Sequence, residues 1–353
     1  MRIRLSEITA EFASAGIFIE QFGSNPLIER IYSTDDCKPG DLVFVESKEY
    51  LQKTRRNSPA AVVIPPTLKM EFAAENTLGV VVAKNVKLAH ALVKTRYADR
   101  DYLTEQWGKI HASAVIHESA VVPKSCWVSP NVVIGQDVVL GENCRILAGA
   151  VVENGVVMGR DCLIHPNAVI GYNCILGNEV EIGMGSVIGS EGYGFAQDEK
   201  RKSHRLPQTG IVHLEDRVRI GSGNCIDRAP YGKTRIGAGT KTDNLCHIAH
   251  GVQIGEDCLL TAMLCVAGST VIGDRVITSG QTGILDHMKI CSDVVLVHRA
   301  GVTRDIEEPG MYAGLPHQPL NLYMKNTASL RSLAELAKKV NHLEKQLEEL
   351  KKN

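Results

Sequence analysis

Two histidines three residues apart, His247 and His250, stand in the stretch TDNLCHIAHGVQIG, residues 242–255. Histidine titrates near neutral pH, so it can act as a general base, and a neutral imidazole can also bind a metal. A third histidine, His287, follows Asp286 further along the chain. Residue types and spacing therefore leave three possibilities open: a catalytic base, a zinc site made by His247, His250 and His287, or histidines with no chemical role.

The segments that must position these histidines follow a six-residue repeat. An aliphatic residue recurs at every sixth position from Ile110 to Ile188, and the series reappears at Leu214, Ile220 and Ile226. It then runs from Ile236 to Val302, with threonine at two of its positions. A period of six does not fit an amphipathic helix, but it fits short strands joined by corners, three to each turn of a triangular solenoid. The predicted fold class is therefore mainly β, a parallel β-helix of hexapeptide repeats. The register is lost over residues 190–210 and shifts by four at APYGK, residues 229–233, so both segments are expected to loop out of the repeat.

Stacking of coils brings distant residues into one column. If one coil takes 18 residues, residues 18 apart lie about 4.8 Å from each other, so His250, Gly268 and Asp286 share a column, with His287 beside them. A glycine beneath the histidine lets a substrate carbonyl approach the backbone, whose N–H can stabilise an oxyanion. This combination suits acyl transfer from a thioester to an amine or a hydroxyl. Asp243, seven residues before His250, could accept the other ring N–H.

The zinc alternative is less favoured because two histidines three residues apart straddle a corner of a six-residue face, and alternate strand positions point in different directions. The chain has ten cysteines but no C-x-x-C pair. Six of them occupy the small-residue position four places after the aliphatic one, and we expect them to be buried core residues in a reducing compartment. These six are Cys126, Cys144, Cys162, Cys174, Cys246 and Cys258.

The repeat is flanked by two segments of different character. Residues 1–106 show no six-residue period, and their strand-like runs DLVFV, AAVVIPP and LGVVVA predict a separate α/β domain. The β-helix is expected over 107–306. Residues 307–353 begin with EEPGMYAGLPHQP and continue as a helix whose heptad spacing favours self-association, with packing inside the chain as the alternative. The heptad positions are Leu333, Leu336, Val340, Leu343, Leu347 and Leu350.

Charge and hydropathy narrow the classes of partner. The formal net charge of −1 over 353 residues gives no basic field for nucleic acid. The first 25 residues lack the basic and apolar regions of a signal peptide, and no run of 18 uncharged apolar residues occurs. We therefore expect a soluble, cytoplasmic protein without stable membrane insertion.

Six motifs together resemble the UDP-3-O-acylglucosamine N-acyltransferase family: NLCHIAHGVQIGEDCLL, GILDHMKICSDV, GSEGYGFA, LPQTG, IDRAP and EPGMYAGLP. They occur in the family's order and spacing, and the similarity spans nearly the whole chain. The resemblance implies a left-handed β-helix and a homotrimer. It also implies transfer of a 3-hydroxyacyl chain from acyl carrier protein to the 2-amine of UDP-3-O-acylglucosamine in lipid A biosynthesis, with no cofactor and no covalent acyl-enzyme.

The same resemblance implies individual roles in catalysis. His250 in IAHGV matches the general base, Gly268 in VAGS the oxyanion donor and Asp243 in TDN the acid that orients the base. His287 in DHM matches a second histidine that contacts substrate, and His247 is left as a substrate-side or structural residue.

The resemblance extends to substrate binding. The family holds uracil with a pattern like F-x-x-N-x-x-Y, which reads FVESKEY here and gives Phe44 and Tyr50, with Ser47 in place of the asparagine. Aromatic rings can stack on any base. Arg304 is a candidate contact for the acidic carrier protein or for the phosphate of its pantetheine.

Three other functions remain as alternatives. The O-acyltransferase of the same pathway, which acts on UDP-N-acetylglucosamine, also carries HIAH but typically lacks such an N-terminal domain. A zinc-dependent hexapeptide-repeat lyase would use the three histidines as ligands. In a non-catalytic scaffold, the column of His250, Gly268 and Asp286 would be incidental.

Overall fold

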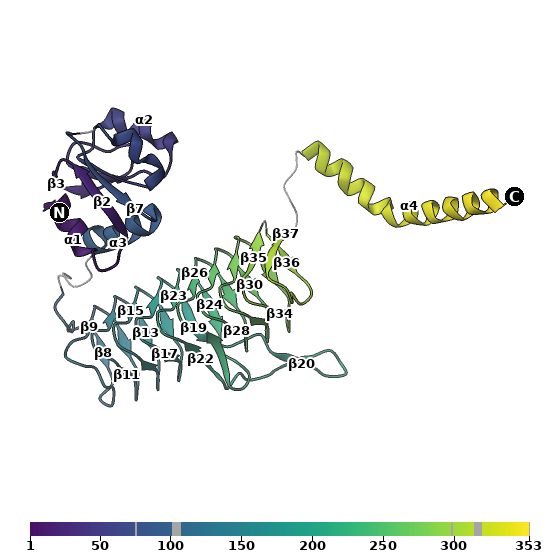
Figure 1. Cartoon of the computed structure of the whole chain (residues 1–353). Helices are drawn as coiled ribbons and strands as arrows, with labels where there is room; N and C mark the ends of the chain where they lie inside the picture. Colours follow the sequence, from purple (N-terminus) through teal and green to yellow (C-terminus); the bar gives the residue numbers. More distant parts are fainter. Residues whose placement is uncertain (75, 101–106, 298, 314–319, 353) are drawn as a thin grey trace. The chain divides into compact units, whose positions relative to one another are not determined.

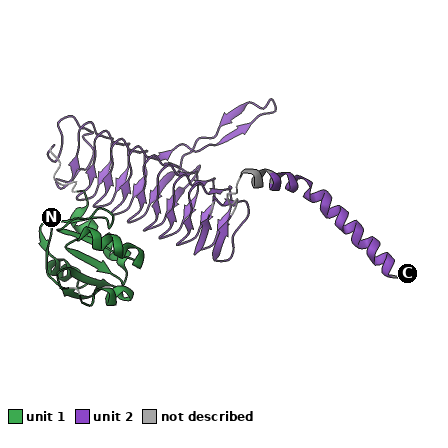
Figure 2. Ribbon diagram, turned by 90° about the horizontal axis from the view of Figure 1, so that it is seen from above, with its two compact units in different colours: residues 1–104 green, residues 105–353 purple. Residues whose placement is uncertain are grey.

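The computed structural model describes residues 1–74, 76–100, 107–297, 299–313 and 320–352. The chain forms two compact units, Met1–Thr104 and Glu105–Asn353, shown in different colours in Figure 2. The expected domain boundary at residue 106 lies outside the described residues, and the expected third segment, 307–353, falls within the second unit.

A five-stranded sheet forms the centre of the first unit. Its three central strands are buried along their whole length, since helices cover both faces of the sheet. Four neighbouring strands run parallel, and β2 pairs antiparallel with β7 at one edge. The order across the sheet is β2 (Phe18–Gly23), β7 (Gly79–Ala83), β6 (Ala61–Ile64), β5 (Asp41–Phe44) and β4 (Arg30–Ile31). Two short strands, β1 (Ile3–Arg4) and β3 (Leu27–Ile28), pair separately.

Residues of β5 alternate between the two faces of this sheet. Leu42 and Phe44 join one core with residues of α1 (Leu5–Glu11) and α3 (Val86–Ala98). Val43 joins the other core with residues of α2 (Lys48–Asn57) and of the 3-10 helix η1 (Pro66–Phe72). The expected α/β arrangement of this unit is therefore present.

The second unit is a left-handed parallel β-helix of three sheets (Figure 1). The first sheet contains β8 (Val115–Ile116), β10 (Val133–Ile134), β13 (Val151–Val152), β16 (Val169–Ile170), β19 (Val187–Ser190), β24 (Cys225–Asp227), β27 (His247–Ile248), β30 (Cys265–Val266), β33 (Gly283–Ile284) and β36 (Gly301–Val302). The second contains β9 (Trp127–Val128), β12 (Arg145–Ile146), β15 (Leu163–Ile164), β18 (Glu181–Ile182), β23 (Arg219–Ile220), β26 (Lys241–Thr242), β29 (Leu259–Leu260), β32 (Ile277–Thr278), β35 (Val294–Val297) and β37 (Gly310–Ala313). The third contains β11 (Val139–Leu140), β14 (Val157–Met158), β17 (Ile175–Leu176), β22 (Ile211–Leu214), β25 (Lys233–Ile236), β28 (Gln253–Ile254), β31 (Val271–Ile272) and β34 (Lys289–Ile290).

Alternation along these short strands builds the core of the β-helix. In β10, for example, Val133 faces outward while Ile134 is buried, and Val133 pairs with Val151 on the next coil, 18 residues later. The aliphatic series found in the sequence is thus the inward column, as its period predicts. All six cysteines assigned to the small-residue position are buried, which confirms their interpretation as core residues.

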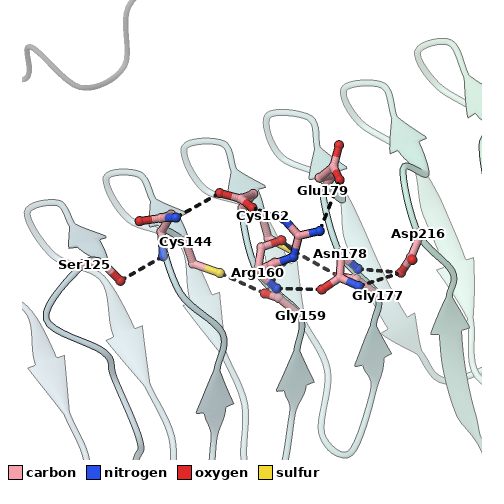
Figure 3. Close-up of polar contacts among 11 residues, drawn as sticks. Ser125, Cys144, Gly159, Arg160, Cys162, Gly177, Asn178, Glu179 and Asp216 are labelled. Atoms are coloured by element: carbon pink, nitrogen blue, oxygen red, sulfur yellow. Dashed lines mark hydrogen bonds and ion pairs between the residues drawn. The ribbon is translucent and has the colours of Figure 1, made fainter.

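Polar side chains at one corner of the prism form a ladder along the coils (Figure 3). The Arg160 N–H donates to Asn178 Oδ1 at 3.1 Å, and the Asn178 N–H donates in turn to Asp216 Oδ1 at 2.8 Å. Inside the same corner, the Cys162 thiol donates to the Gly177 carbonyl at 3.2 Å. Such bonds satisfy backbone groups that a tight corner would otherwise leave without partners.

Both predicted interruptions of the repeat are confirmed. Across residues 190–210 the paired positions are 38 apart, as in Ile175 with His213, and across the second interruption they are 22 apart, as in Cys225 with His247. The longer insertion contains the antiparallel hairpin of β20 (Phe195–Gln197) and β21 (Ser203–Arg205), which projects from the β-helix in Figures 1 and 2.

The helix predicted near the C-terminus is α4 (Leu320–Lys352). Its six heptad residues are all exposed in the single chain, so no described residue covers the apolar stripe. No helix in the described part of the chain combines the length and the apolar character that a membrane span requires.

Candidate active site

His250 lies at the corner between β27 and β28, where its backbone is held on both sides. The Ala249 N–H donates to the Val266 carbonyl at 2.9 Å on the next coil. The Gly251 N–H donates to Thr234 Oγ1 at 2.9 Å, and Thr234 is fully buried on β25. These bonds fix the direction from which the His250 side chain leaves the corner.

Two glycines pack against the His250 side chain. A Cβ atom added to Gly268 would lie 2.4 Å from Cε1 of His250, and one added to Gly192 would lie 2.8 Å from its Cβ. Neither glycine has a positive φ, so each is needed for space rather than for backbone freedom. The structure thus brings Gly268 directly against His250, as the 18-residue spacing predicts. It also places Gly192, from the long insertion, against the same side chain.

The Gly268 backbone N–H has no acceptor among the described residues, whereas the two neighbouring corner bonds are made. The Ser269 N–H donates to the His250 carbonyl at 2.9 Å, and the His287 N–H donates to the Gly268 carbonyl at 3.0 Å. The free N–H of Gly268, held on a rigid corner beside an imidazole, can stabilise negative charge that develops on a nearby oxygen.

A buried carboxylate, Asp227, lies beside the histidines. Its Oδ2 atom is 3.7 Å from Nε2 of His247, its Oδ1 atom accepts the Ser190 hydroxyl at 2.7 Å, and only 5% of the residue is exposed. Burial raises the pKa of Asp227, although the Ser190 hydroxyl and the neighbouring His247 and His250 favour its ionised form.

The expected contact between Asp243 and His250 is not made within this chain. Asp243 lies at the corner before β27 and accepts the N–H groups of Asn244 and Ala262, at 2.7 and 3.2 Å. Nδ1 of His250 is buried and has no hydrogen-bond partner among the described residues. Asp243 and His250 lie at corners on opposite ends of β27. The carboxylate near the histidines is therefore Asp227 instead of Asp243.

His247 and His287 take different positions around His250. His247 faces outward on β27, where its neighbours in the ladder are Cys225 and Cys265, and its side chain is 44% exposed. His287 lies one coil beyond Gly268 and exposes 74% of its side chain to solvent. Within the described ranges, no group of three or more His, Cys, Asp or Glu side chains is arranged to hold a metal ion.

Arg228 anchors the insertion that carries Gly192. Its guanidinium donates to the carbonyls of Gly189 at 2.8 Å, Gly210 at 3.2 Å and Tyr172 at 3.1 Å, and it lies 3.4 Å over the ring of Tyr172. Because Gly189 and Gly210 flank the insertion, this buried arginine holds both of its ends. Gly189, Gly210 and Arg228 lie in the motifs GSEGYGFA, LPQTG and IDRAP, but these motifs are so far apart along the chain that spacing could not reveal the contacts.

The first unit contains a cavity of about 280 Å³ that includes two of the predicted uracil contacts. Phe44 is 9% exposed at the end of β5, and its ring stacks on His90, with centroids 4.4 Å apart. Tyr50 is exposed in the first turn of α2, and Ser47 is the N-cap residue of that helix and does not line the cavity. The lining residues are Tyr32, Ser33, Thr34, Asp35, Phe44, Glu46, Tyr50 and His90.

Arg304 lies in a cavity of about 700 Å³ at the C-terminal end of the β-helix. Asp305, Glu307 and Glu308 line the same cavity, so its described part does not form a basic surface. This charge pattern gives no support of its own to Arg304 as a contact for an acidic partner.

Comparison with known proteins places this chain among acyltransferases. It is 47% identical, over 99% of its own length and 99% of the relative's, to a UDP-3-O-acylglucosamine N-acyltransferase of Methylococcus capsulatus. A protein of the same name from Wolinella succinogenes is 41% identical over 41% of this chain and 46% of that protein. The solved structure of an Arabidopsis UDP-N-acetylglucosamine acyltransferase superposes with a TM-score of 0.53 at 27% identity, over 58% of this chain and 71% of that chain. Residues 110–192 also match the model of the GMPPB C-terminal domain.

Proposed function

Because the chain belongs to the UDP-3-O-acylglucosamine N-acyltransferase family, we propose that it transfers a 3-hydroxyacyl chain from acyl carrier protein to the 2-amine of UDP-3-O-acylglucosamine. We place this reaction in the cytoplasm, in a homotrimer. The observation that carries the proposal is the packing of Gly268, with its unused N–H, directly against the imidazole of His250.

Direct transfer assigns one role to each of these groups. His250 takes a proton from the amine as its nitrogen attacks the thioester carbonyl, and a C–N bond forms. The Gly268 N–H donates to the oxyanion of the tetrahedral intermediate. The C–S bond then breaks, and the proton held by His250 passes to the leaving sulfur, which restores the neutral base. No acyl-enzyme is required.

The cavity of the first unit supports binding of the nucleotide. Phe44 is buried at one wall, and Tyr50 offers an exposed ring at the same cavity. His90 already stacks on one face of Phe44, so a base entering the cavity meets the Phe44–His90 pair rather than an isolated ring. Burial lowers the pKa of His90, and Lys94 acts in the same direction, which favours a neutral ring for stacking.

The exposed heptad stripe of α4 supports self-association. Six large apolar side chains at coiled-coil spacing face solvent in the single chain, and burying such a stripe between helices is the usual source of coiled-coil stability. The spacing alone does not fix the number of chains.

O-acyl transfer to UDP-N-acetylglucosamine is the second candidate, because the solved Arabidopsis acyltransferase shares the β-helix at 27% identity. The two functions are separated by incubating the protein with a panel of acyl carrier proteins and both acceptors, followed by mass spectrometry. We expect an added acyl group on the amine-bearing, 3-O-acylated acceptor alone. Acylation of UDP-N-acetylglucosamine instead would overturn the proposal.

A further inference from the structure

Asp227 is a buried carboxylate to which the proposed reaction gives no role. It lies on β24, between β19, which carries Ser190, and β27, which carries His247. Burying a carboxylate is costly unless charges or hydrogen bonds compensate. Among the described residues, the Ser190 hydroxyl is its only hydrogen-bond donor, and no lysine or arginine forms an ion pair with it.

The neighbouring arginine does not neutralise Asp227. Arg228 directs its guanidinium at three backbone carbonyls and the ring of Tyr172. The titratable groups that face Asp227 are therefore His247, 3.7 Å away on the adjacent strand, and His250, whose charge also acts on this carboxylate. A buried acid with only histidines as ionisable partners is expected where a histidine must carry charge for part of a reaction.

Ser190 joins this carboxylate to the segment that packs on the base. Its hydroxyl donates to Asp227, and Gly192, two residues later, lies against the His250 side chain. One hydrogen bond thus ties the start of residues 190–210 to the acid beside the histidines.

We propose that Asp227, held by Ser190, is a positioning residue that stabilises the imidazolium formed when His250 accepts the proton of the attacking amine. The inference rests on the proposed function, which requires that His250 become positively charged in a partly buried site. Asp227 acts through space, since it makes no hydrogen bond to His250 among the described residues.

The experiment compares wild type with Asp227→Asn, Ser190→Ala and the control Glu181→Gln. Glu181 is also a partly buried carboxylate beside a histidine, but it contacts His165 on another sheet. We expect Asp227→Asn to lower the plateau of kcat/KM about tenfold, with its acid limb moved about half a pH unit or more to lower pH. Ser190→Ala should shift both in the same direction by less, and Glu181→Gln should leave both unchanged.

Histidine-selective NMR titration of the same folded variants provides a readout that does not depend on acyl transfer. Loss of the carboxylate should change the imidazole resonances of His247 and His250 and leave those of His287 in place. An acid limb and resonances that are unchanged in Asp227→Asn would overturn the inference. If the wild type transferred no acyl group, the proposed function would fail, while the titration would still decide whether Asp227 acts on the histidines. Thermal unfolding identifies any variant that has lost its fold.

Discussion

Two histidine and carboxylate pairs of the β-helix differ in the distance between the ring nitrogen and the carboxylate oxygen. Nε2 of His165 lies 2.9 Å from Glu181, and Glu181 also lies 3.3 Å from Arg219. Around His250, in contrast, the nearest carboxylate contacts His247 at 3.7 Å, and Nδ1 of His250 has no partner within the described residues. The first pair makes a direct hydrogen bond, whereas the second region leaves an imidazole and an N–H available to a substrate.

This difference separates structural from chemical roles better than residue type does. A carboxylate bonded to a ring nitrogen does not by itself distinguish the two histidines, because such a contact can also orient a catalytic base. The His250 region differs in having Gly268 packed against the imidazole, with a backbone N–H beside the ring that is free within the described residues. The same β-helix therefore contains one histidine that fixes a strand and another that is placed for reaction.

The largest expected effect comes from removing each histidine in turn. His250→Ala should lower kcat for amine acylation by about 10²- to 10⁴-fold, because general-base assistance is lost, while the protein stays folded. His165→Ala should keep kcat within about threefold and instead lower the free energy of unfolding by about 1–3 kcal/mol, because Glu181 loses its partner. Steady-state assays and urea unfolding check both values. Equal losses of kcat would remove the distinction between the two regions.

A methyl group added beneath the base should have the next largest effect. In Gly268→Ala the new Cβ overlaps the imidazole of His250, so the ring must move, and we expect kcat to fall by about 10²-fold. Gly283→Ala is the matched control on the same sheet, since its Cβ would have no atom within 4 Å. Similar rates for the two variants would contradict a packed arrangement of Gly268 and His250.

The anchor of the long insertion should matter less than the base itself. Arg228→Met removes three bonds to carbonyls, so we expect residues 190–210 to be cleaved faster by protease and kcat to fall about tenfold as Gly192 loosens against His250. Arg275→Met removes an arginine and carboxylate pair that solvent screens, so it should leave the rate of cleavage and kcat unchanged. Limited proteolysis followed by mass spectrometry locates the cleavage, and protection equal to that of wild type would rule out the anchoring role.

The smallest expected effect is that the stability contributed by Glu181 and the stability contributed by Asp227 change in opposite directions as the pH falls. The His165 hydrogen bond lowers the pKa of Glu181 from 4.5, so its stabilisation is present above that pH and is lost as pH falls through the lowered pKa. Burial raises the pKa of Asp227 from 3.8, so its contribution is fully present below that pH and is lost as pH rises through the raised pKa. Histidines 247 and 250 face Asp227 and reduce this second effect.

Urea unfolding from pH 8 to pH 4 measures how the free energy of unfolding of wild type, relative to each variant, changes with pH. Relative to Asp227→Asn, wild type should become more stable as the pH falls across this range. Relative to Glu181→Gln, wild type should keep its advantage down to about pH 4.5 and lose it only below. A parallel response of the two differences would show that both carboxylates are stabilised in the same way.

Much of this arrangement could be predicted from the sequence, because in a regular β-helix residues 18 apart along the chain lie next to each other on successive coils. The six-residue period predicts the three sheets, the buried column and the stacking of His250 on Gly268. The insertion at 190–210 has no six-residue period, so the contacts of Ser190, Gly192 and Asp227 could not be predicted from sequence spacing. Asp243 makes no hydrogen bond to His250 in the single chain, because the seven residues from one to the other span a whole face of the prism.

The first unit was predicted less completely for a similar reason. Phe44 and Tyr50 belong to one short motif and do line one cavity. His90 and Tyr32, which share it, come from α3 and from the loop after β4, and no local pattern connects them. Non-periodic packing of this kind depends on tertiary contacts that a single sequence does not display.

The central claim, that His250 is the base for amine acylation, is tested most directly by the pH dependence of kcat/KM in wild type and in His250→Ala. We predict that His250→Ala lowers kcat/KM by about 10²- to 10⁴-fold at every pH at which the substrate amine is neutral. A variant with kcat/KM close to that of wild type at those pH values would show that another group accepts the proton.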